Sequence, residues 1–203
     1  RAAYITPVDG GLTLTTLYGR AGDNAPLDQA GFTQWTQGLP HPIVHTRLQG
    51  ATLVGSLKKY AIPTGLWVRY DQMPDLPAGL VPMGEAVTSF NPMYGQGISL
   101  AAGQALALRA ALHDASEANR HPNSVAPSYF SASHELNEVG WSVMETRDFV
   151  YASTQGSRPD DLDARWQSGR AVRRLAEHDN EVHSQNVRVT HLLDHPRKMQ
   201  TLN

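Results

Sequence analysis

The pattern of apolar and polar residues predicts strands in the first part of the chain and helices in the second. Residues 3–8 and 12–18 are rich in β-branched residues and flank an Asp9-Gly10-Gly11 turn, which predicts a β-hairpin. Residues 26–35 favour a short helix that is capped at Asn24 or beside it. Further apolar runs predict strands at 51–55, 59–62, 66–70 and 79–83.

The second half of the chain has helical periodicity. An Ala- and Leu-rich segment at 98–113 predicts a helix with a face of small residues, which allows close backbone approach. Apolar residues at helical spacing predict a long helix over 128–150, and shorter helices follow at 161–178 and 180–193. Strands followed by helices in this order are typical of an α+β fold.

Residues 84–101 are the most informative stretch of the sequence. They connect the predicted strand 79–83 to the predicted helix 98–113 through a loop with glycines at 84, 95 and 97. Glycine removes the side chain where a backbone turns sharply or approaches a ligand. The first N–H groups of the helix that follows lack intrahelical acceptors and suit an anionic or electron-rich group. The pattern indicates a ligand cradle without identifying the ligand.

The same residues carry a resemblance to a known family. Gly84, Pro92, Gly95 and Gly97 match the second FAD-contact motif of flavin-dependent aromatic hydroxylases. The form Ser-Phe-Asn-Pro-x-Tyr-Gly-Gln-Gly is similar to bacterial proteins related to 2-polyprenyl-6-methoxyphenol hydroxylase. In one departure, Glu85 replaces the family's aspartate, which keeps the carboxylate but moves it outward by one methylene.

The resemblance implies a set of site residues but no catalytic side chain, because the flavin carries the chemistry in such enzymes. Glu85 would hold a ribitol hydroxyl, and backbone N–H groups after Gly95 would lie near the flavin ring. Asn91 and Tyr94 would line the flavin or the substrate cavity, or else Asn91 completes the turn and Tyr94 packs. The implied cofactor-binding residues are Gly84, Glu85, Pro92, Gly95, Gln96, Gly97, Ile98 and Ser99.

The resemblance also implies a domain organisation and a reaction. Residues 1–75 would form an antiparallel substrate-binding sheet, 76–115 the second half of a Rossmann-like FAD-binding domain, and 116–203 a C-terminal helical region. The implied enzyme is an FAD-dependent monooxygenase. It would use NAD(P)H and dioxygen to hydroxylate or epoxidise a small organic substrate.

The Gly-x-Gly-x-x-Gly fingerprint that binds the FAD pyrophosphate is absent from the sequence. We therefore expect an N-terminal half, on the same polypeptide or on a separate one, as the partner of this chain. The alternative is a non-catalytic fragment, or a subunit that completes a flavin site only beside such a half.

Composition narrows the remaining possibilities. A formal net charge of −2 gives no electrostatic reason to expect nucleic acid as a partner, and the lack of cysteine fits a cytoplasmic protein. No apolar run reaches the roughly 18–20 residues of a transmembrane helix. His191 and His195 have the i, i+4 spacing of a metal pair, but Pro196 follows at once, so we expect no metal site.

Overall fold

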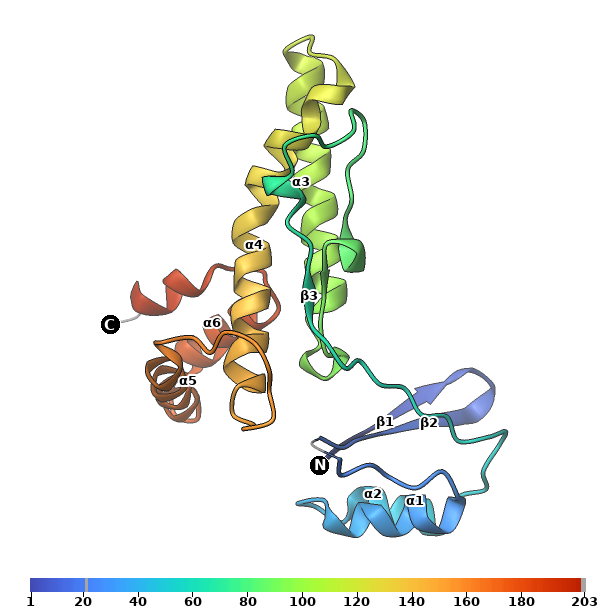
Figure 1. Cartoon of the computed structure of the whole chain (residues 1–203). Coiled ribbons are helices and arrows are strands. Elements are labelled where there is room, and N and C mark those ends of the chain that lie inside the picture. The colour runs from blue at the N-terminus through green and yellow to red at the C-terminus, as the bar shows by residue number, and fades with distance from the viewer. Residues whose placement is uncertain (21, 202–203) are drawn as a thin grey trace. The chain divides into compact units, whose positions relative to one another are not determined.

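The structure is a computed structural model that describes residues 1–20 and 22–201. The chain divides into two compact units, residues 1–61 and residues 62–203. The predicted second and third regions, 76–115 and 116–203, thus belong to one compact unit, together with residues 62–75. Helices and two small antiparallel sheets make up the regular structure of the described residues, which fits the α+β class (Figure 1).

The first unit begins with the predicted hairpin. Strand β1 (Ala2–Val8) pairs antiparallel with β2 (Leu12–Tyr18), with Val8 opposite Leu12 at the turn. The connecting residues Asp9–Gly11 form a 3-10 turn in which Gly10 and Gly11 have φ of 75° and 70°. The pairing of the two strands confirms the predicted hairpin. Its turn forms at these residues because glycine adopts the left-handed conformation without strain.

Helices and loops in the rest of this unit differ from the prediction. Helix α1 (Gln29–Trp35) starts later than predicted, because the Asp28 carboxylate caps it by accepting the Gly31 N–H at 2.8 Å. Helix α2 (Ile43–Gln49) follows and was not predicted. The strands predicted at 51–55 and 59–62 are wrong: residues 51–61 hold no regular structure, and Val54 and Tyr60 are 69% and 80% exposed.

In place of the antiparallel sheet predicted over residues 1–75, the described residues form two separate two-stranded sheets, and the one in the second unit is small. Strand β3 (Leu66–Trp67) pairs antiparallel with β4 (Thr88–Ser89), so the predicted strand 66–70 shrinks to two residues. The strand predicted at 79–83 is wrong. Gly79 has φ of 83°, Pro82 has no N–H to donate, and the Pro82 carbonyl accepts the Tyr129 hydroxyl at 3.0 Å instead of a neighbouring strand.

The four predicted helices of the second unit are confirmed, with shifted ends. Helices α3 and α4 lie side by side and run in opposite directions, and α5 and α6 follow them (Figure 1). Their bounds are Gly97–Glu117 for α3, Val125–Asp148 for α4, Leu162–Ala176 for α5 and Asn180–Thr190 for α6.

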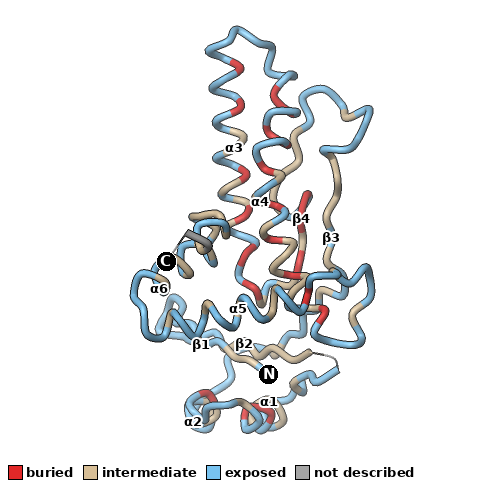
Figure 2. The backbone as a smooth tube through the Cα atoms, turned by 90° about the vertical axis from the view of Figure 1, so that its left-hand side faces the viewer, coloured by how far each residue is buried: buried red, intermediate tan, exposed pale blue. Residues whose placement is uncertain are grey.

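The core of this unit lies between α3 and α4, where buried positions recur along both helices (Figure 2). Near one end, Ala111 and Ala115 pack with Val125, Tyr129 and Phe130. A second cluster near the start of α3 consists of Phe90, Tyr94, Leu100 and Met144. The alanines and glycines of α3 allow the close approach that the sequence predicted, since a Cβ at Gly103 would lie 2.4 Å from the Leu136 side chain.

The two histidines with metal-pair spacing lie beyond the end of α6. Because α6 ends at Thr190 and Leu192 has φ of 57°, His191 and His195 do not share a helix face. No group of three or more His, Asp or Glu side chains suited to a metal ion occurs within residues 1–20 and 22–201.

Among the described helices, none has both the length and the apolar character needed to cross a membrane.

Candidate functional site

The first part of the predicted cradle, Gly84–Ala86, packs against the start of α3 and is called the Gly84 corner below. Residues Gly84–Ala86 make a single 3-10 turn, η4, that begins with Gly84 at φ of 66°. The Gly84 N–H donates to Oε1 of Gln104, and a Cβ at Gly84 would lie 3.8 Å from that of Ala101. The first residue of the motif is therefore held beside the second turn of α3.

Glu85 follows this anchored glycine and is exposed. Its carboxylate makes no hydrogen bond or ion pair with any residue that the structure describes. Such a carboxylate can accept a hydrogen bond from a ligand hydroxyl, which is the role that the resemblance implies for it.

The second glycine turn is built by Asn91 and Pro92. The Asn91 side-chain oxygen accepts the Met93 N–H at 3.0 Å and caps a 3-10 turn, η5 (Pro92–Tyr94). Gly95 ends this turn in the left-handed conformation, with φ of 68°. Asn91 thus has the turn-forming role of the two considered for it, and a contact with substrate stays a prediction.

Helix α3 begins on an open surface. Its first backbone bond runs from the Leu100 N–H to the Gln96 carbonyl, so the preceding N–H groups have no intrahelical acceptor. A Cβ on Gly95 or on Gly97 would meet no atom within 4 Å, and Ile98 is 88% exposed. Gly97 has no positive φ, so neither backbone conformation nor crowding within the chain requires glycine there.

Gln96 points into the protein rather than toward this surface. Its side chain is only 4% exposed, and Nε2 donates to the Thr190 carbonyl at 2.7 Å. Its Oε1 is buried without a hydrogen-bond partner among the described residues. The Gln96 side chain therefore holds the glycine turn against the end of α6. Of Gln96, only the backbone is left to contact a ligand at the exposed start of α3.

Tyr94 is also buried, at 6% exposure, within the cluster of Phe90, Leu100 and Met144. Its hydroxyl donates to the Asp148 carboxylate, and the Arg147 guanidinium lies 5.3 Å from the centre of its ring. Tyr94 therefore ties the glycine turn to the end of α4. This placement matches the packing role, and a substrate contact by Tyr94 stays a prediction.

A buried polar network supports the corner and was not predicted. Gln104 is fully buried; its Oε1 accepts the Gly84 N–H, and its Nε2 donates to Asn137 Oδ1 at 2.7 Å. The Thr88 hydroxyl lies 3.5 Å from the same Asn137 oxygen. One signal in the sequence could have indicated this network: Gln104 is a polar residue within an otherwise apolar stretch of the Ala- and Leu-rich helix.

Comparison with known proteins finds a relative that is similar to part of this chain. No protein-family model matches the chain. Protein Rv3254 of Mycobacterium tuberculosis is similar over a stretch of 65 residues, in which 45% of the residues are identical. That stretch makes up 32% of this chain and 14% of the relative. The similarity covers a small part of a longer protein, so it assigns no activity to this chain.

Proposed function

We propose that this chain is the C-terminal part of an FAD-dependent oxidoreductase of the monooxygenase type. One observation carries the proposal: the Gly95–Gly97 turn presents the N-terminus of a 21-residue helix on an open surface. Nothing within the chain explains a glycine at position 97, whereas the close approach of a flat ring to the backbone does.

The residues present fit a flavin in two respects. The unpaired N–H groups at the start of α3 suit the electron-rich edge of the ring, and they are fixed in place before any ligand arrives. The exposed carboxylate of Glu85 can accept a ribitol hydroxyl, although it stands where the family has aspartate. When bound, FAD would supply the electron transfer and the oxygen chemistry, with NAD(P)H as reductant.

The chain's own residues would bind and orient the cofactor. Gln104 and Asn137 hold the Gly84 corner against α3, and Gln96 and Tyr94 hold the second turn from inside. Such support from behind keeps a binding surface rigid. The proposed substrate is a small organic molecule.

An N-terminal half, on the same polypeptide or on a separate one, would complete the site, because the pyrophosphate-binding fingerprint is absent from this sequence. The same absence favours the second candidate, a non-catalytic subunit or fragment. The colour of the complete protein, purified together with its N-terminal half, distinguishes the two: a yellow protein that releases flavin on denaturation supports an intact FAD site, and a colourless one supports the non-catalytic alternative.

We predict that the 203-residue chain alone binds FAD poorly, because it lacks the pyrophosphate anchor. Titration of the chain with FAD, followed by flavin fluorescence, measures this directly. Stoichiometric binding at submicromolar FAD would show that no N-terminal half is needed.

We predict that Glu85→Ala weakens FAD retention in the complete flavoprotein by about tenfold or more. A hydrogen bond to a charged group contributes about 1.5–3 kcal/mol, and each 1.4 kcal/mol is a factor of ten in affinity. Glu85→Asp restores the family's residue and should retain FAD. The dissociation constant of each variant is the measurement, with the melting temperature as a control for folding.

Glu117→Ala is the matched control for this prediction. Glu117 is an exposed acid at the C-terminal end of α3, whereas Glu85 lies in η4 beside the start of that helix. It should leave FAD retention unchanged. If Glu85→Ala also retains FAD like the parent protein, then Glu85 is a surface acid without a role in binding.

A further inference from the structure

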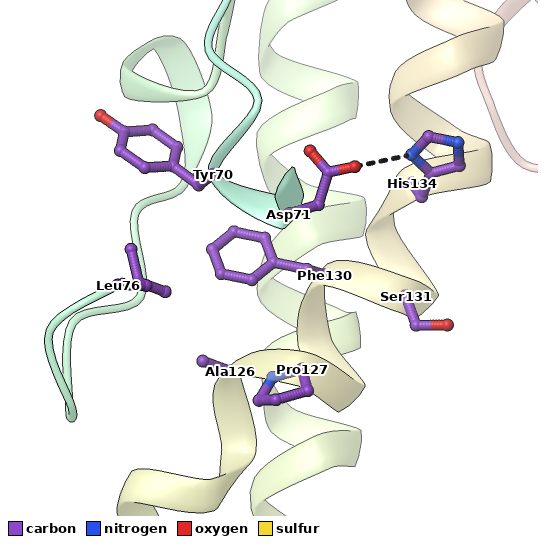
Figure 3. Close-up of a pocket in the computed structure, with 8 residues that line it drawn as sticks. All are labelled: Tyr70, Asp71, Leu76, Ala126, Pro127, Phe130, Ser131 and His134. Atoms are coloured by element: carbon purple, nitrogen blue, oxygen red, sulfur yellow. Dashed lines mark ion pairs between the residues drawn. The ribbon is translucent and has the colours of Figure 1, made fainter. Parts of the chain in front are cut away.

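A hollow lies away from the glycine turns, between α4 and the loop that contains η3 (Tyr70–Gln72). Its volume is about 430 Å³, which lies within the usual range of small-molecule sites. Figure 3 shows the side chains that line it. Tyr70, Asp71 and Leu76 come from the loop side, and Ala126, Phe130 and His134 are among those from α4.

Two aromatic rings stand near-parallel at this hollow. The centres of the Tyr70 and Phe130 rings are 6.4 Å apart, and their planes differ by 19°. Phe130 is anchored in the core at 7% exposure, whereas Tyr70 lies on the loop. Rings in this arrangement offer flat apolar faces to a planar ligand, which can stack on them.

The other end of the hollow is polar and holds a carboxylate that is paired with an arginine. Asp71 accepts two hydrogen bonds from Arg69, at 2.9 and 2.6 Å, and the Nδ1 atom of His134 lies 3.5 Å from the same carboxylate (Figure 3). The Arg69 guanidinium holds the pKa of Asp71 below its usual range. A carboxylate has about four acceptor positions, so Asp71 can still accept a hydrogen bond from a ligand.

His134 is itself held between two acids. Its Nε2 atom lies 3.2 Å from Glu138, one turn further along α4, and its ring lies 5.8 Å from that of Trp67. The Arg69 guanidinium covers the same Trp67 ring at 4.5 Å. The side chains at the polar end are thus held in place by one another. Two acids, Asp71 and Glu138, stand there with one arginine.

We propose that this hollow binds a small planar aromatic molecule that donates a hydrogen bond from one edge. The ring would lie against Tyr70 and Phe130, and the donor would face the Asp71 carboxylate. A ligand of this class matches both ends of the hollow, because it is apolar on its faces and polar at one edge only. The site does not rest on the proposed flavin chemistry and requires no cofactor.

Indole and benzofuran test the proposal as a matched pair. The two have the same shape, but benzofuran has an oxygen where indole has the N–H donor. We expect indole to bind the protein at least about tenfold more tightly than benzofuran, since a hydrogen bond to a charged acceptor contributes about 1.5–3 kcal/mol. Protein-observed NMR titration gives both affinities. Equal affinities, or no saturable binding of indole up to its solubility limit, would overturn the proposal.

Two variants locate the binding. Ser131 lies at the rim of the hollow on an exposed part of α4, so Ser131→Trp should fill the hollow, leave the fold intact and abolish indole binding. Ala132 is its exposed neighbour and does not line the hollow, so Ala132→Trp should bind indole like the parent protein. Asp71→Asn should remove most of the preference for indole over benzofuran. Unchanged indole binding by Ser131→Trp would place the ligand elsewhere and refute the site.

Discussion

Replacing Gln104 by leucine is expected to lower the free energy of unfolding by about 2–4 kcal/mol. The leucine fills a similar volume but leaves the Gly84 N–H and the Asn137 side-chain oxygen without their partner. Each buried polar group that loses its hydrogen bond costs about 1–3 kcal/mol. Urea unfolding followed by circular dichroism measures the change.

Gln167→Leu is the control for this experiment. Gln167 is an exposed glutamine on α5, and its replacement should change the stability by less than about 0.5 kcal/mol. The double variant Gln104→Leu, Asn137→Leu should be less destabilised than the sum of the two single changes, because it removes both partners of one bond. A fully stable Gln104→Leu protein would show that the network does not hold the Gly84 corner.

The second large effect is expected at Gly97. In the complete flavoprotein, Gly97→Val should lower FAD affinity by about five- to 150-fold, since forcing extra carbon atoms into a close contact costs about 1–3 kcal/mol. The fold should survive, because a Cβ at this position meets no atom of the chain and the backbone has no positive φ. Flavin content and turnover rate are the measurements.

Gly169→Val on α5 provides a matched control. Gly169 is also a helical glycine whose Cβ would meet open space, but it lies outside the glycine turns. Both variants should melt near the parent protein, and only Gly97→Val should lose flavin. If both retain flavin equally, the turn at 95–97 is a structural element only.

Local chemistry allowed part of this fold to be predicted from the sequence. Asp9-Gly10-Gly11 predicts the hairpin because its glycines adopt the left-handed backbone that the turn needs. The helices of the second unit follow from apolar residues that recur with helical period. Helix α2 was not predicted, because Pro40 and Pro42 stand just before it and proline interrupts a helix. Pro42 is in fact the N-cap residue of α2, where no intrahelical N–H is needed.

The remaining features depend on contacts between residues far apart in the sequence. The apolar runs at 51–55 and 79–83 have strand composition, but a strand also needs a neighbour to accept its hydrogen bonds. The pairing of Gln104 with Asn137, and of Asp71 with His134, follows only once α3, α4 and the η3 loop are packed together. The glycine motif could be located from sequence, whereas only Gln104 of its supporting network gives a sequence signal, and its partner Asn137 does not.

Flavin analysis of the complete protein tests the central claim most directly. The protein would be purified from its native source under non-denaturing conditions, denatured, and assayed for released FAD by absorption and mass spectrometry. The account predicts stoichiometric FAD together with a Gly-x-Gly-x-x-Gly sequence, either on the same polypeptide or on one that copurifies. A colourless preparation that contains such a sequence but no flavin would contradict it.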